Sequence, residues 1–129
     1  MKTNLMRVIE YIEDTETWEN VCRADQLIDN IGVCALIGDL QVAIFRLSGT
    51  HQLYAIDNRD PFSAASVLSR GVVGDLKGQP VVASPIYKQH FNLATGQCLD
   101  DAAVKLATYP VRIENGVVQV MLPAKTGTD

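Results

Sequence analysis

The sequence predicts an all-β domain, built as an antiparallel sandwich or barrel of many short strands. Three observations favour this fold class. Val, Ile and Thr, which pack well on pleated sheets, account for 14, 9 and 8 of the 129 residues. The apolar runs are short, and turn signals rich in Gly, Asp, Asn and Pro separate them. The dipeptide Asn115-Gly116 joins the last two runs and is a strong hairpin signal.

The expected strands follow one another from residue 18 onward. Each ends where an apolar run meets a turn signal, which places them at residues 32–37, 41–47, 52–56, 80–84, 89–93, 108–113 and 117–122. Gly71, Gly74 and Gly78 are expected in turns, because glycine adopts backbone conformations that other residues avoid. Many short strands at this spacing are typical of a sandwich or a barrel.

The first residues have a different pattern. Leu5, Val8, Ile9 and Ile12 recur at i, i+3, i+4 and i+7, which predicts one apolar face of a short helix. The expected organisation is therefore an N-terminal extension at 1–17, one domain at 18–122 and a flexible tail at 123–129.

Composition excludes several classes of function. The chain has 11 Lys and Arg against 15 Asp and Glu, a formal net charge of −4, which opposes binding to nucleic acid or to an anionic membrane surface. No apolar run reaches the length of a signal peptide or a membrane span. The three Cys are widely spaced and imply no disulfide framework. These features predict a cytoplasmic protein with reduced thiols.

Two segments carry a more specific pattern. Residues 53–62 read Leu-Tyr-Ala-Ile-Asp-Asn-Arg-Asp-Pro-Phe, and residues 82–87 read Val-Ala-Ser-Pro-Ile-Tyr. The second segment continues into Phe-Asn-Leu-Ala-Thr-Gly at residues 91–96. In order, separation, prolines and the final Thr-Gly turn, they resemble the two cluster-binding loops of Rieske iron–sulfur domains. The resemblance covers most of residues 18–122 and implies a Rieske-like fold, an antiparallel sandwich or barrel with two loop hairpins.

The ligands of a Rieske cluster are missing from these loops. A Rieske [2Fe–2S] centre needs two Cys on one iron and two His on the other. Aligned on the prolines, Asp60 and Ser84 stand at the Cys positions, and Phe62 and Tyr87 stand at the His positions. We therefore expect no cluster, no other metal and no bound cofactor in this chain.

Residues 67–71 read Val-Leu-Ser-Arg-Gly and indicate one particular group of Rieske-like domains. A Rieske-like domain with this segment, Asp-Pro-Phe in the first loop and Ser-Pro in the second is similar to the small subunits of assimilatory NAD(P)H-dependent nitrite reductases. That resemblance implies an accessory subunit of an oxidoreductase, without catalytic residues of its own. Its partner would be a large subunit that carries FAD, a [4Fe–4S] cluster and sirohaem and reduces nitrite to ammonium.

The loops also suggest local roles. We expect Phe62 and Tyr87 to meet as an aromatic brace where the cluster would lie, and Asp60 and Ser84 to accept hydrogen bonds from loop N–H groups. The expected contact surface for the large subunit consists of Arg59, Asp60, Phe62, Arg70 and Tyr87.

Other functions fit the sequence less well. An electron-carrying Rieske ferredoxin would need the missing ligands, and a free-standing enzyme would need a nucleophile with a nearby base, which we do not find. A nucleic-acid-binding module is opposed by the acidic balance. The main alternative is a cluster-free Rieske-like interaction module with a different partner, because fold does not fix function.

Overall fold

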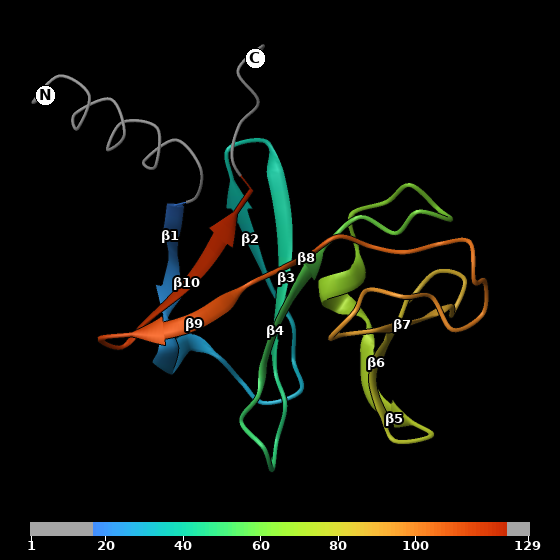
Figure 1. Cartoon of the computed structure of the whole chain (residues 1–129), viewed down its shortest axis with the longest axis horizontal. Helices are drawn as coiled ribbons and strands as arrows, with labels where there is room; N and C mark the ends of the chain where they lie inside the picture. The colour runs from blue at the N-terminus through green and yellow to red at the C-terminus, as the bar shows by residue number, and fades with distance from the viewer. Residues whose placement is uncertain (1–16, 124–129) are drawn as a thin grey trace, which may run out of the picture.

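A computed structural model describes residues 17–123 (Figure 1). The expected N-terminal extension at 1–17, with its short helix, and the expected tail at 123–129 lie outside the described residues, except for Thr17, which begins the first strand, and Pro123. The described part consists of short strands and two 3₁₀ turns: β1 (Thr17–Arg23), η1 (Ala24–Gln26), β2 (Val33–Ile37), β3 (Leu40–Arg46), β4 (Leu53–Asp57), η2 (Leu68–Arg70), β5 (Val72–Leu76), β6 (Gln79–Ala83), β7 (His90–Asn92), β8 (Thr108–Tyr109), β9 (Val111–Glu114) and β10 (Val117–Leu122).

A four-stranded antiparallel sheet with the order β2-β3-β4-β8 forms the centre of the molecule. Its strand β3 is buried on both faces. Val42 and Ile44 enter one hydrophobic core, and Ala43 and Phe45 enter the other. A strand covered on both sides needs a continuous apolar run rather than an alternating pattern, which the sequence Val-Ala-Ile-Phe supplies.

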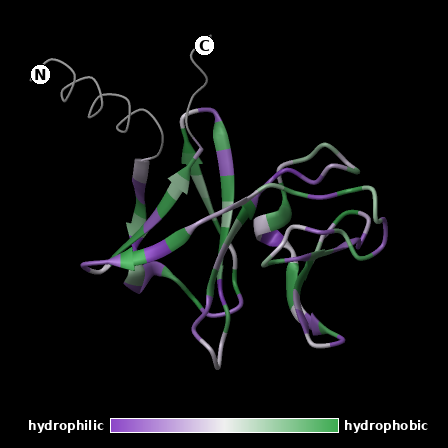
Figure 2. Ribbon diagram, in the orientation of Figure 1, coloured by the Kyte–Doolittle hydropathy of each residue, from purple (hydrophilic) through white to green (hydrophobic). Residues whose placement is uncertain are grey.

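Two smaller sheets cover the central one. The sheet β1-β10-β9 lies on one side, where Val118 and Val120 of β10 pack against Val42 and Ile44. The sheet β5-β6-β7 belongs to the second core, to which it contributes Val82 and Phe91. Figure 1 shows these two sheets on opposite sides of β3 and β4. Figure 2 shows hydrophobic colour along the inner strands and hydrophilic colour at the ends of the hairpins.

The structure confirms the predicted all-β class and most of the expected strands. The expected run 108–113 is divided at Pro110 into β8 and β9, because proline has no N–H for the sheet. β1 and β5 were not among the expected strands. The assignment of Gly74 to a turn is wrong, since Gly74 lies inside β5, whereas Gly78 does lie in the β5–β6 turn.

Candidate functional site

The first of the two motif loops follows β4 and is held by its own main chain. The Asp60 N–H donates to Ala65 O at 2.8 Å, and the Ala64 N–H donates to Asp60 O at 2.7 Å. Ala64 adopts a left-handed conformation with φ +66°, which closes the turn. The carboxylate of Asp60 accepts a hydrogen bond from the Phe62 N–H at 2.9 Å, as expected from the sequence.

The second motif loop, between β6 and β7, repeats this arrangement. The Ser84 N–H donates to Gln89 O at 2.9 Å, and the Lys88 N–H donates to Ser84 O at 3.1 Å. Lys88 has φ +67°, and the Ser84 hydroxyl accepts from the Ile86 N–H at 3.3 Å. The two loops are therefore copies of one turn, and Asp60 corresponds to Ser84.

Asp60 and Ser84 join the two loops directly. The Ser84 hydroxyl donates a hydrogen bond to Asp60 Oδ2 at 2.5 Å, and both side chains are fully buried. A buried carboxylate needs such donors, because its desolvation is costly without them. Asp60 now has one donor on each oxygen, from Phe62 N and from Ser84 Oγ. The expectation that Asp60 belongs to a contact surface is wrong, because no part of it is exposed.

The expected brace between Phe62 and Tyr87 is also wrong. Phe62 packs against Phe91 of β7, with ring centroids 6.2 Å apart and ring planes at 45°. Tyr87 is 60% exposed. The reason lies in the matching of the two turns: the residue after the proline is Phe62 in one loop and Ile86 in the other. Tyr87 is one position further on, in the exposed stretch of its loop.

A buried asparagine that the sequence reasoning missed holds the first loop in place. Asn58 donates to Gln41 Oε1 at 3.1 Å and accepts from the Ser69 N–H at 2.7 Å. It thereby ties the start of the loop to β3 and to η2. Its only sequence signal was its place in a polar turn segment, which does not distinguish a buried anchor from an exposed turn residue.

The exposed parts of the two loops differ in character from this buried support. Arg59 and Arg70 are exposed, and Phe62 is half-buried. On the second loop, Ile86 is 42% exposed and Tyr87 is 60% exposed. The two loops and the adjoining η2 thus present apolar and aromatic side chains together with two arginines.

The side chains of the loops do not fit the cluster that the Rieske fold family implies. At the thiolate positions stands a buried Asp–Ser pair, joined by a hydrogen bond. At the imidazole positions stand a half-buried phenylalanine and an exposed tyrosine. Within residues 17–123, no group of three or more His, Cys, Asp and Glu side chains is placed to hold a metal ion.

Burial raises the pKa of the Cys22 and Cys34 thiols above 9.0, although Arg70 opposes this effect at Cys34.

Comparisons with known proteins support the Rieske-like fold. Residues 17–121 match the family model of the Rieske-like [2Fe-2S] domain. The chain is 46% identical over 103 residues to the nitrite reductase (NADH) small subunit of Escherichia coli (strain K12), a match that covers 80% of this chain and 95% of the relative. The chain belongs to the family of nitrite reductase small subunits.

Two further relatives extend this comparison. The crystal structure of a Mycobacterium tuberculosis protein proposed to be an NADH-dependent nitrite reductase small subunit has a TM-score of 0.81 and 46% identity. That match covers 85% of this chain and 98% of the other. A nitrite reductase [NAD(P)H] large subunit of Klebsiella oxytoca is 42% identical over 103 residues, which is 80% of this chain but only 11% of the relative. In that protein, a segment like this chain is part of a much longer polypeptide.

No helix among the described residues has the length and apolar character needed to cross a membrane.

Proposed function

We propose that this chain is the accessory small subunit of a cytoplasmic NAD(P)H-dependent nitrite reductase, which reduces nitrite to ammonium. The proposal is carried by the 46% identity that extends over 95% of the E. coli small subunit. The partner would be the large subunit, which would hold FAD, a [4Fe–4S] cluster and sirohaem. Because the loop side chains of this chain do not fit a [2Fe–2S] cluster, we assign it no electron-transfer step.

The Klebsiella relative supports a large subunit as the partner. There, a domain 42% identical to this chain is part of the large-subunit polypeptide itself. Covalent linkage keeps two parts of an enzyme at a high effective concentration. A separate chain in the same role must bind its partner through a surface of its own.

The two loops and the adjoining η2 offer a suitable surface, which we call the loop face: Arg59, Phe62, Arg70, Ile86 and Tyr87. Exposed aromatic and arginine side chains are the types that contribute most to binding at protein interfaces. The buried Asp60–Ser84 pair lies behind this surface and fixes the two loops relative to each other. The role of the chain would then be to bind the large subunit through a rigid surface and to hold that subunit in an ordered conformation.

The proposal is tested by adding the chain to the large subunit from the same organism. We expect the two to co-elute from a sizing column and the chain to raise NADH- or NADPH-dependent nitrite reduction. Tyr87→Ala should weaken co-elution, whereas Ile113→Ala, at a 41% exposed residue of β9, should not. If wild-type chain neither co-elutes nor changes turnover, the chain is instead an interaction module for another partner.

A further inference from the structure

The strand β5 forms a free edge on the side of the molecule that carries the two loops. It is the outer strand of the sheet β5-β6-β7 and pairs only with β6 among the described strands (Figure 1). Its five residues, Val72–Leu76, contain no proline and pair with β6 without a bulge. Proline and bulges are two of the means by which natural proteins keep an edge strand from pairing, and β5 has neither, so its edge is a candidate binding element.

The geometry of the β5–β6 hairpin shows which main-chain groups are free. Lys77 and Gly78 have φ +54° and +82°, the signature of a two-residue type I′ turn. The pair Leu76–Gln79 that closes such a turn shares two hydrogen bonds, and bonded pairs then alternate along the strands. The N–H and C=O groups of Val73 and Asp75 therefore point away from β6.

Pro80, the partner of Asp75, supports this assignment. Proline has no N–H to donate, and the Pro80 carbonyl accepts a hydrogen bond from the Leu93 N–H at 2.9 Å, on the side opposite β5. Among the hydrogen bonds found for residues 17–123 outside the strand pairs, none involves the main chain of Val73 or Asp75. The main-chain donors and acceptors of these two residues that point away from β6 are thus without partners among the described residues.

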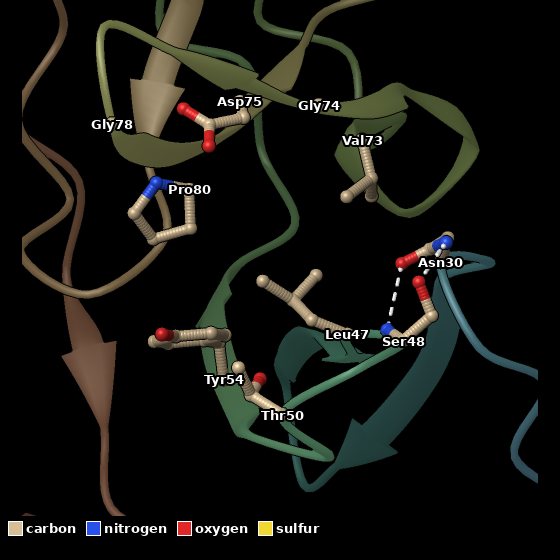
Figure 3. Close-up of a pocket in the computed structure, with 10 residues that line it drawn as sticks. All are labelled: Asn30, Leu47, Ser48, Thr50, Tyr54, Val73, Gly74, Asp75, Gly78 and Pro80. Carbon is tan, nitrogen blue, oxygen red and sulfur yellow. Dashed lines mark hydrogen bonds between the residues drawn. The ribbon is translucent and has the colours of Figure 1, made fainter.

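Both faces of this edge can receive side chains from an added strand. On the outer face, Val72 is 72% exposed and Leu76 is 36% exposed, with Gly74 in open space between them. On the inner face lies a cavity of about 420 Å³ (Figure 3). Leu47 and Tyr54 form one side of it, and the opposite side belongs to the β5–β6 hairpin. An extended peptide alternates its side chains between two such faces.

The charge at the edge indicates the occupant. Asp75 is exposed and makes no ion pair among those found in the described residues. In a second copy paired along all five residues, the register would centre on Gly74, and the two Asp75 side chains would be diagonal neighbours on one face. Two carboxylates at diagonal positions, about 7–8 Å apart, repel each other and so disfavour this pairing. A partner strand with a basic residue beside Asp75 would instead gain from it.

We propose that the free edge of β5 binds an extended segment of the reductase large subunit, which adds to the sheet as a strand and places a basic residue beside Asp75. This inference rests on the proposed function. The edge begins two residues after Arg70, so it is continuous with the loop face. Strand addition gains affinity from main-chain hydrogen bonds and selectivity from alternate side chains.

Residue-resolved hydrogen exchange of the full chain, with and without the large subunit, tests this geometry. The amides of Val73 and Asp75 should exchange at least about tenfold more slowly in the complex, because they gain partners there. The amides of Gly74 and Leu76 are already bonded to β6 and should change much less. This alternation distinguishes strand addition from general shielding of the hairpin.

Matched variants test the same surface by affinity. Asp75→Pro removes the free N–H, which an edge strand tolerates, whereas Asp75→Ala removes only the carboxylate. We expect Asp75→Pro to raise the Kd for the large subunit at least about tenfold and Asp75→Ala to raise it less. Val72→Lys should also weaken binding, and Ile113→Lys on the edge strand β9 should not. Thermal melting confirms that each variant is folded.

The outcomes separate this inference from the proposed function. If the large subunit binds the chain but leaves the exchange of Val73 and Asp75 unchanged, the β5 site is wrong and the function stands. If the large subunit does not bind at all, both are wrong. If protection at these two amides appears in the isolated chain and grows with its concentration, the occupant is a second copy, and the assignment to the large subunit is overturned.

Discussion

Ser84 donates its hydroxyl hydrogen to Asp60 Oδ2, and this buried hydrogen bond joins two loops that lie 24 residues apart in the chain. In a Rieske domain, a cluster would hold two such loops together through four protein ligands. Here a single polar contact connects them, and each partner also caps an N–H of its own loop. The same two residues therefore shape the turns and join them.

Loss of this contact should be costly. Ser84→Ala leaves a fully buried carboxylate oxygen without its donor, and hydrogen bonds to charged groups contribute about 1.5–3 kcal/mol. We expect the free energy of unfolding to fall by that amount in urea titrations. Ser66→Ala, at an exposed serine beside the first loop, should change it by less than about 0.5 kcal/mol. Equal stability of the two variants would show that the Asp60–Ser84 bond does not hold the loops.

A double-mutant cycle isolates the contact itself. If Asp60 and Ser84 act as one unit, the two alanine substitutions together should cost less than the sum of their separate costs. We expect a coupling energy between about 0.5 and 3 kcal/mol, the range found for residues in direct contact. Additive costs would mean that each residue acts only within its own loop.

The two aromatic residues of the loops should differ in how much they contribute to stability. Phe62 packs on Phe91, so Phe62→Ala should lower the free energy of unfolding by about 2 kcal/mol, less than for a fully buried ring. Tyr87 is 60% exposed, so Tyr87→Ala should cost less than about 0.5 kcal/mol in stability. Urea titration of both variants provides the comparison. A large loss of stability in Tyr87→Ala would contradict the prediction that its exposed ring adds little to the fold.

Two glycines three residues apart should respond to substitution in opposite ways. A Cβ on Gly71 would lie 2.4 Å from the Ala83 carbonyl oxygen, which is main chain and has little room to move. Gly71→Ala should therefore destabilise the fold by about 1–3 kcal/mol. Gly74 has open space around it, and Gly74→Ala should stabilise β5 by about 0.5 kcal/mol through reduced freedom of the unfolded chain. Calorimetric melting of both variants tests this, and a shift of the same sign in both would contradict it.

Local sequence patterns were sufficient to predict the central strands and the place of the two loops. The apolar run of β3 and the Asn115-Gly116 turn each depend on adjacent residues, which a local pattern can detect. Pro61 and Pro85 show in the sequence where the two loops lie. β5 was missed because three glycines in eight residues are typical of turns, and only pairing with β6 makes this segment a strand.

The site was predicted only in part, for a physical reason. The hydrogen bonds from Phe62 N to Asp60 and from Ile86 N to Ser84 span two residues, so a local pattern could predict them. The bond between Asp60 and Ser84 depends on how two sheets position their loops, and no local pattern encodes that. The error at Tyr87 is local instead, because Ile86 follows the proline of its loop as Phe62 does, and Tyr87 lies one position further on, in an exposed stretch.

High pH should weaken the fold through Tyr109. Burial, and to a lesser extent the nearby Asp57 carboxylate, raises the pKa of this phenol above its ordinary value of 10.0. The unfolded chain therefore loses this proton at a lower pH than the folded chain. The stabilisation is complete below pH 10 and is lost as the pH rises through the folded-state pKa, with a slope of at most about 1.4 kcal/mol per pH unit.

Urea titrations at several values between pH 9 and pH 11.5 measure this slope. A Cys22→Ser/Cys34→Ser background is needed, because burial raises the pKa of both thiols and adds a slope of the same sign. In that background, Tyr109→Phe should flatten the decline, because phenylalanine keeps the ring and has no proton to lose. Asp57→Asn should flatten it less, since it removes only the smaller of the two causes. A decline that is unchanged in Tyr109→Phe would show that this phenol has the same pKa in the folded and unfolded chain.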